Sequence, residues 1–350
     1  MNVGEAKAIA RRWVTEHAAE VPGLLGVLMA GSMNYRPEDS EYHPTSDVDL
    51  WHVMEGDPDF LGHKEVMCQG VLLELAGKPS AQFADAETVL TSWVNASQLQ
   101  TPSVIYDPTG RLTAIQREVA KRFGEPRYVK ARCAGIESSV QRGTLPGMVS
   151  SATLSERIVA FTFTGLTIRE LPLVAAGRPP TFRRSAMLFT DEMTARARGE
   201  LAERMLEYIG SARMSRTDAE QLLTACTAAY DRALEVKRSP VPFGFKVCPA
   251  SRQHMIDGSR ELIDQGYPRE AVWWIQAVHY AAHNVLERDA PDEWERVYRE
   301  PYQRLLDALG IGSLEAVAAK VPLAEELLSR TMAVAEEIME TSADLRVEPV

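Results

Sequence analysis

Short apolar runs dominate the first third of the chain and long helical stripes the remainder. Runs bounded by Gly, Pro or Asp predict strands at Leu24–Ala30, Asp47–Met54, Gly70–Ala76 and Val104–Tyr106. Apolar residues at helical spacing predict helices over 4–20 and 110–123. From about residue 130 only helices are expected, near residues 153–176, 185–210, 215–238, 250–265, 268–288, 293–309 and 313–341. The pattern therefore predicts an α/β part and an all-α part, divided at roughly residues 125–135.

Two aspartates lie two residues apart in the second predicted strand. Asp47 and Asp49 alternate there with Val48 and Leu50. Because side chains alternate between the faces of a strand, both carboxylates point to the same side. Two carboxylates on one rigid edge suit a pair of Mg²⁺ ions. The pattern is weak alone, since Asp57 and Asp59 repeat it in what we predict to be a turn over residues 56–59.

The order of motifs around this strand is more specific. Gly31-Ser32 follows the first apolar run and precedes Asp47 by a polar loop, residues 33–46. A Gly-Ser turn after a strand offers backbone N–H groups to a phosphate. Other Gly-Ser pairs occur in the chain, but only this one lies between an apolar run and an Asp pair. The combination predicts an enzyme that handles a nucleoside triphosphate.

A third carboxylate interrupts the next apolar run. Glu74 lies between Leu73 and Leu75, where a carboxylate facing the core is costly unless it is paired or bound to a metal. Three carboxylates would converge if this strand lay beside the one with the Asp pair. The alternative is a solvent-facing Glu74 on an edge strand.

Charge and cysteine content narrow the class of partner and the compartment. Residues 1–100 hold 6 Lys and Arg against 15 Asp and Glu, whereas residues 101–350 hold 32 against 34. The acidic part lacks the basic footprint of a nucleic-acid binder, and it suits cations: Mg²⁺ and a cationic small substrate. A solvated acidic surface is an equal alternative. The four cysteines form no CxxC pair, and no signal peptide or membrane-spanning stretch is visible, so we expect a soluble, cytoplasmic protein.

These motifs resemble those of the DNA polymerase β-like nucleotidyltransferases. That family's signature is an apolar run with Gly-Gly or Gly-Ser, a loop, an Asp–apolar–Asp/Glu strand and a third carboxylate on a neighbouring strand. Gly31-Ser32, the strand start Ser46–Leu50 and Glu74 match it. Ile105–Leu112 also resembles a strand-to-helix turn in its small members. The similarity covers residues 20–125 and is greatest to the minimal, antibiotic-modifying type. This chain departs from that type in its long loop 33–46, which is either a substrate-facing insertion or ordinary loop variation.

The resemblance implies both architecture and activity. It implies the α+β class: a small mixed-sheet nucleotidyltransferase domain at residues 1–128, then an all-α helical-bundle domain at 129–350 that binds substrate or nucleotide. The implied activity is transfer of a nucleoside monophosphate from a triphosphate to a hydroxyl of a small molecule, with release of pyrophosphate. ATP is the expected donor, and an aminoglycoside-like antibiotic is the expected kind of acceptor. A homodimer is compatible with it.

The site residues follow from matching the motifs. Asp47, Asp49 and Glu74 are the expected catalytic residues and ligands of two Mg²⁺ ions. The expected nucleotide-binding residues are Gly31, Ser32, Ser46 and Arg184. Arg184 belongs to a basic segment with Arg178 and Arg183 that could grip a triphosphate, although a solvated basic turn is the simpler interpretation. The general base is Glu74 or a glutamate of the helical part.

A second candidate metal site lies in the helical part. His279 and His283 are four residues apart and share a helix face, as zinc ligands can. The zinc-protease pattern needs Glu directly after the first His, where this chain has Tyr280. Helix packing is therefore the favoured interpretation.

Three other functions remain open at this point. The acceptor could be a protein or a tRNA, as in toxin-like members, although the acidic half argues against RNA. The chain could be an inactive nucleotide-binding regulator, which the presence of all three carboxylates argues against. It could also be a helical adaptor with an N-terminal scaffold.

Overall fold

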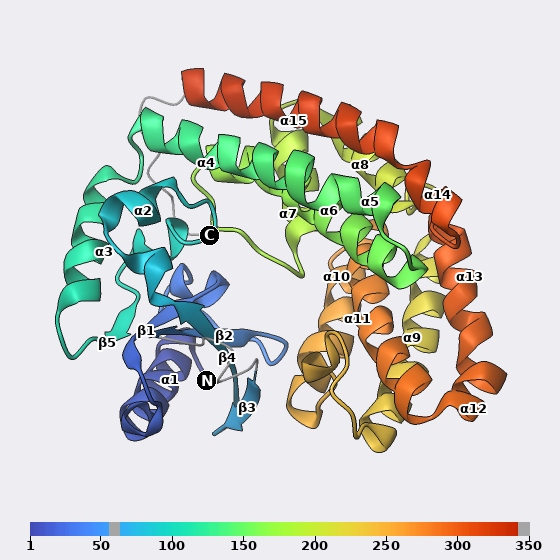
Figure 1. Cartoon of the computed structure of the whole chain (residues 1–350), viewed down its shortest axis with the longest axis horizontal. Helices are drawn as coiled ribbons and strands as arrows, with labels where there is room; N and C mark the ends of the chain where they lie inside the picture. The colour runs from blue at the N-terminus through green and yellow to red at the C-terminus, as the bar shows by residue number, and fades with distance from the viewer. Residues whose placement is uncertain (56–63, 342–350) are drawn as a thin grey trace. The chain divides into compact units, whose positions relative to one another are not determined.

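The computed structural model describes residues 1–55 and 64–341 and has a mixed α/β structure (Figure 1). A five-stranded mixed sheet is combined with many helices, consistent with the α+β class. The chain divides into two compact units: residues 1–135, 174–181 and from Ile338 onward form the first, and residues 136–173 and 182–337 form the second. The domain boundary expected at residue 128 stays a prediction, and the turn expected at residues 56–59 lies outside the described residues.

The sheet of the first unit has the strand order β3-β4-β2-β1-β5. Its strands are β1 Leu24–Ala30, β2 Asp47–Met54, β3 Lys64–Cys68, β4 Val71–Pro79 and β5 Val104–Tyr106. β2 and β4 are parallel, and the other neighbours are antiparallel. The bounds predicted for β1, β2 and β5 are confirmed, and the run predicted at Gly70–Ala76 forms β4.

Edge strand β3 was not predicted, because its sequence shows no clear alternation. It forms a hairpin with β4 through the two-residue loop Gln69–Gly70, where both residues have positive φ, 50° and 83°. Such a loop has the twist that antiparallel neighbours need. β3 therefore depends more on the turn that follows it than on an apolar pattern of its own.

Alternation along the strands gives the sheet two different apolar faces. Val48, Leu50 and Leu73 pack with residues of α1 (Val3–His17) in one buried cluster. Leu28 and Val53 face the other way and pack with α2 (Ala86–Thr91) and α3 (Arg111–Arg122). Figure 1 shows α1 on one side of the sheet and α2 and α3 on the other. Asp47 and Asp49 belong to the α2–α3 face, because they share the parity of Val53.

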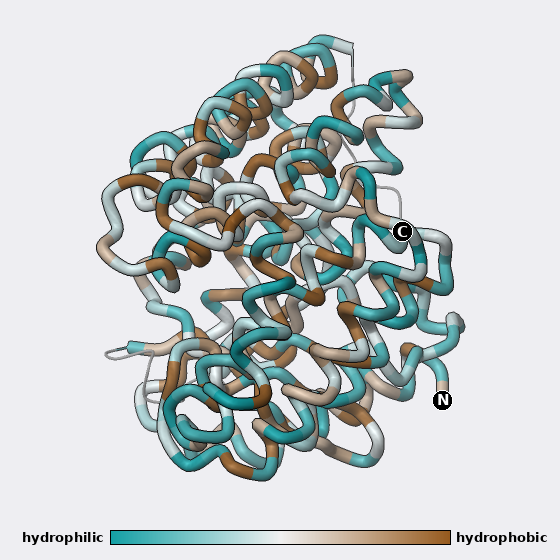
Figure 2. The backbone as a smooth tube through the Cα atoms, turned by 90° about the vertical axis from the view of Figure 1, so that its right-hand side faces the viewer, coloured by the Kyte–Doolittle hydropathy of each residue, from teal (hydrophilic) through white to brown (hydrophobic). Residues whose placement is uncertain are grey.

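The second unit contains only helical elements. Among the described residues, the remaining α-helices are α4 Pro126–Ser138, α5 Leu145–Ser150, α6 Leu154–Ala175, α7 Ser185–Ala195, α8 Gly199–Ile209, α9 Arg216–Val236, α10 Gly258–Asp264, α11 Pro268–Asp289, α12 Pro291–Glu293, α13 Arg299–Leu309, α14 Leu314–Ala318 and α15 Val321–Thr341. α11 is the most buried of them and packs mainly against α9. Figure 2 shows apolar and polar positions side by side along these helices, as amphipathic packing requires.

Two of the helices expected to be continuous are broken. The helix expected at 185–210 is divided into α7 and α8 at Ala197, which has a φ of +56°. The helix expected at 313–341 is divided between α14 and α15, and Pro322 lies at the start of the second segment, where its missing N–H costs nothing. Both breaks depend on local backbone geometry that apolar periodicity does not report.

One helix among the described residues is long and apolar enough to cross a membrane. It is α6, and 78% of its most apolar window is buried inside the protein. Buried core helices pass the same length and composition test, so α6 is weak evidence for a membrane span.

Candidate functional site

Three carboxylates meet on the α2–α3 face of the sheet. Asp49 and Glu74 are direct partners across the parallel pair β2–β4, and Asp47 precedes Asp49 by two residues on the same face. One ligand oxygen from each carboxylate lies within 4.8 Å of the other two, and all three side chains are half-buried. Among the described residues, this is the only group of three or more His, Cys, Asp or Glu side chains arranged to share a metal ion. The convergence expected for Glu74 is confirmed.

Gly31 makes the space that the Asp49 carboxylate occupies. Ala30 is the β1 partner of Asp49, so the chain leaves β1 directly beside that side chain. Gly31 has a φ of +69°, and a Cβ atom placed on it would lie 1.7 Å from Oδ2 of Asp49. Both the backbone conformation and the close approach therefore require glycine here.

The turn after Gly31 is ordered by a residue that no motif indicated. The Gly31 N–H donates to Oε1 of buried Gln98 at 2.9 Å, and Asn34 Nδ2 donates to the Gln98 carbonyl oxygen at 3.3 Å. Ser32 is exposed and begins the short 3-10 helix Ser32–Asn34. A phosphate bound by the Gly31 N–H would have to replace the amide oxygen of Gln98.

Ser46 connects the preceding loop to β2. Its hydroxyl accepts a long hydrogen bond from Arg36 Nη1 at 3.4 Å, and its carbonyl oxygen accepts from the Tyr42 hydroxyl at 2.7 Å. Burial raises the pKa of Tyr42 to about 12, and the nearby Asp47 charge adds to this. The expected nucleotide contact of Ser46 stays a prediction beside this observed structural role.

Much of the loop 33–46 packs against the start of α1. The N–H groups of Val3 and Gly4 donate to the carbonyl oxygens of Ser40 and Glu38 at 2.9 and 2.8 Å. Lys7 Nζ donates to the Arg36 carbonyl oxygen at 3.1 Å. These contacts favour ordinary loop variation over a substrate-facing insertion for residues 36–40.

Two further charged residues, both missed in the sequence, lie on the face of the triad. Glu65 on β3 is directly opposite Glu74 across the antiparallel pair, so the two share a face. Lys78 follows Glu74 by four residues on β4, and its ammonium lies 4.2 Å from the centre of the Trp51 ring. Strand parity could have indicated Lys78 once Glu74 was recognised, whereas Glu65 requires knowledge of the β3–β4 register.

Arg184 belongs to the second unit and has an ion-pair partner there. Its Nη2 lies 2.7 Å from Oε1 of Glu261, and Arg183 Nη1 lies 3.5 Å from Oε2 of the same carboxylate. The guanidinium of Arg183 also fills the space over Gly258. These contacts give the basic segment a role in packing, and the triphosphate contact expected of Arg184 stays a prediction.

The two histidines of α11 pack in an aromatic cluster. His283 stacks on Tyr302 with ring centres 4.1 Å apart, and its Nδ1 accepts from Trp294 Nε1 at 2.9 Å. Burial lowers the pKa of His279 to about 3 and that of His283 to about 4, so both are neutral at pH 7. The packing interpretation of this pair is confirmed.

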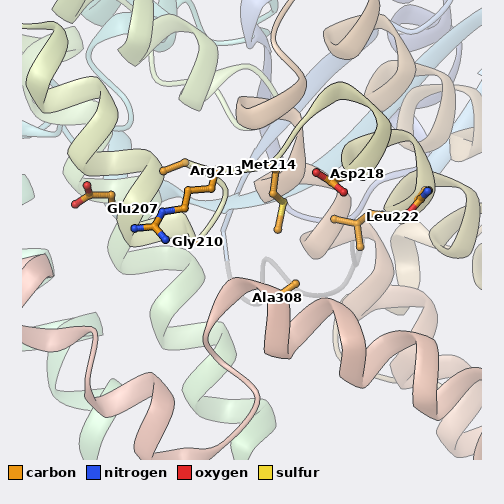
Figure 3. A pocket seen from close by; sticks show the side chains of 9 residues that line it. Glu207, Gly210, Arg213, Met214, Asp218, Leu222 and Ala308 are labelled. Atoms are coloured by element: carbon orange, nitrogen blue, oxygen red, sulfur yellow. The ribbon is translucent and has the colours of Figure 1, made fainter.

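A surface pocket of about 520 Å³ lies in the second unit (Figure 3). Its acidic side chains already have partners, because Glu207 pairs with Arg204 and Asp218 caps α9 through Ser215. Met214 and Leu222 form its apolar part. The pocket presents no set of groups for acid–base or metal chemistry, in contrast to the triad in the first unit.

Comparisons with protein-family models, with curated proteins and with solved structures find no significant match. The geometry of the triad and its surroundings is therefore the basis for a functional assignment.

Proposed function

We propose that the protein is a Mg²⁺-dependent nucleotidyltransferase. The observation that carries the proposal is the carboxylate triad on adjacent parallel strands, with Asp49 against the glycine of a Gly-Ser turn. Three carboxylate oxygens within 4.8 Å of one another are a suitable ligand set for a hard divalent cation. The donor set thus fits the metal that the family resemblance implies.

Each part of the triad has a role in this proposal. Asp47 and Asp49 would hold the ions at the end of the Gly31-Ser32 turn, and Glu74 would complete the set from β4. Bound Mg²⁺ would supply positive charge beside the attacking and leaving oxygens, where negative charge develops during phosphoryl transfer. The Ser32 hydroxyl and nearby N–H groups would orient the β- and γ-phosphates. Glu74, or a glutamate of the helical unit, would accept the proton of the acceptor hydroxyl.

The proposed acceptor is a small hydroxylated, cationic molecule, with aminoglycoside-like compounds as the leading class. The acidic bias of residues 1–100 supports a cationic ligand. ATP is the expected donor, and the all-helical unit would serve substrate or nucleotide binding. The same proposal describes a soluble cytoplasmic enzyme and is compatible with a homodimer.

Pyrophosphate release tests the proposal directly. Purified protein with Mg²⁺ is incubated with each common nucleoside triphosphate and a panel of aminoglycosides and lincosamides. Release that requires one acceptor would support the activity and identify donor and acceptor class together. Metal-dependent triphosphate binding without release would favour a macromolecular acceptor or a regulator. Failure to bind any triphosphate would contradict the proposal.

Asp47→Asn tests the residue at the centre of the proposed chemistry. We expect a rate loss of about 10³-fold, because the variant removes a charged ligand of the metal pair. Asp39→Asn is the matched control, since Asp39 is an exposed loop aspartate outside the triad. Near-normal turnover in the Asp47 variant would remove Asp47 from the mechanism.

A further inference from the structure

Lys78 lies on the triad face of β4 and is half-buried there. Glu74, Ala76 and Lys78 alternate with residues of the opposite face, and Ala76 is the β2 partner of Trp51. Trp51 in turn follows Asp49 by two residues on the same face. The register therefore places Lys78 one step beyond Trp51, in the row that leads to the carboxylates.

The lysine side chain extends back toward the triad. Its ammonium lies 4.2 Å from the centre of the Trp51 ring, a cation–π distance. The Trp51–Ala76 pair is the next pair along this face after the Asp49–Glu74 pair, so an ammonium over the Trp51 ring lies beside both carboxylates. Burial lowers the pKa of Lys78, and the charges of Asp49 and Glu74 oppose this shift. The Trp51 ring thus holds the Lys78 ammonium beside Asp49 and Glu74, two of the three expected metal ligands.

A fixed ammonium beside the triad has opposite effects on the binding of a free metal ion and of a metal–triphosphate complex. It repels a free divalent cation that approaches the carboxylates. The magnesium–triphosphate complex is a net anion, which the three carboxylates repel and the ammonium attracts. An ammonium also forms charge-assisted hydrogen bonds to phosphate oxygens.

We infer that Lys78 is a resident cation of the nucleotide site, which binds a phosphate oxygen of the triphosphate and makes the site prefer the metal–triphosphate complex to the free metal. The inference rests on the proposed function and adds a binding residue to it. It assigns to Trp51 the role of positioning the ammonium. Metal would then enter the site mainly together with nucleotide.

Binding measurements on Lys78→Met test this inference. Free Mn²⁺ binding is followed by electron paramagnetic resonance, and binding of the Mg²⁺ complex of a non-hydrolysable ATP analogue by calorimetry. We expect affinity for the metal–nucleotide complex to fall about tenfold, while affinity for free Mn²⁺ rises severalfold. Changes of opposite sign exclude a damaged site, which would lose both ligands.

Two variants serve as controls. Lys78→Arg keeps the charge and should retain the wild-type preference. Lys64→Met removes an exposed lysine of the same sheet whose β4 partner is Leu75, on the opposite face from Glu74, and it should change neither affinity. If Lys78→Met leaves both affinities unchanged, or lowers both, the inference is wrong. A wild-type protein that binds no metal–triphosphate complex would instead contradict the proposed function itself.

Discussion

At the scale of single residues, the triad depends on what its neighbours lack as much as on its own carboxylates. Gly31 has no side chain where the Asp49 carboxylate lies, and its amide is held by Gln98. A β-carbon at residue 31 would displace the carboxylate or the turn. The Gly-Ser motif therefore has a steric function in this fold, independent of any phosphate.

Gly31→Ala should weaken metal binding at least tenfold, because the new methyl group overlaps Oδ2 of Asp49. Gly110→Ala is the matched control. Gly110 also has positive φ, +73°, but nothing lies within 4 Å of a Cβ atom there, so only the backbone cost of about 1 kcal/mol is expected. Mn²⁺ titration and urea unfolding measure the two effects. Equal metal affinity in both variants would contradict the steric role of Gly31.

At the scale of elements, strand order decides which glutamate belongs to the triad. β4 is the parallel neighbour of β2, one strand spacing of about 4.8 Å away, whereas β3 lies one strand further. Glu74 and Glu65 occupy the same row of the sheet, yet only Glu74 is within reach of Asp49 for a shared ion. The strand that carries each glutamate thus decides whether its carboxylate can share an ion with Asp49.

This difference predicts unequal effects of removing the two charges. Glu74→Gln should weaken Mn²⁺ binding about tenfold or more, because a direct ligand is lost. Glu65→Gln should stay within about threefold of the wild type, since it changes only a more distant charge. Calorimetric titration of both variants provides the comparison. A larger effect at Glu65 would mean that the ion lies nearer the edge strand than the triad indicates.

At the scale of the whole molecule, the carboxylate triad and the buried histidines are in different parts of the chain. The triad is in the first unit, while the helical unit buries neutral histidines among aromatic rings. Burial of His279 and His283 disfavours their protonated forms in the folded state only. Their effect therefore appears in the stability of the protein.

The free energy of unfolding should fall as the pH drops from about 6.5 toward 4. In the unfolded chain histidines bind protons below about pH 6.5, whereas in the folded protein the pKa values are about 3 for His279 and about 4 for His283. Above pH 6.5 the two histidines are neutral in both states and leave the free energy of unfolding unchanged. Below pH 6.5 the unfolded chain binds more protons, and the free energy of unfolding falls by about 1.4 kcal/mol per pH unit for each histidine.

His279→Leu should reduce this dependence by the contribution of one histidine. The variant also removes a buried Nδ1 atom that has no hydrogen-bond partner, so little stability should be lost at pH 7.5. Urea unfolding at pH 7.5, 6 and 5, followed by tryptophan fluorescence and by circular dichroism, measures the slope. An unchanged slope would show that His279 accepts a proton in the folded state.

The sequence by itself determined most of the sheet's strands and the face to which the side chains of the Asp47–Met54 strand point. Apolar runs and turn residues were sufficient for β1, β2 and β5, and the alternation of Asp47 and Asp49 with Val48 and Leu50 placed both carboxylates on one face. The period of a strand is a local property, so it can be read without knowing any partner.

Only the tertiary structure decided which of these faces meet. Three contacts join segments distant in sequence. They are the parallel pairing that brings Glu74 beside Asp49, the Gln98 contact to Gly31 and the position of Lys78 over Trp51. No local pattern specifies such pairings, because their free energy comes from burial and hydrogen bonding between segments that become neighbours only when the chain folds.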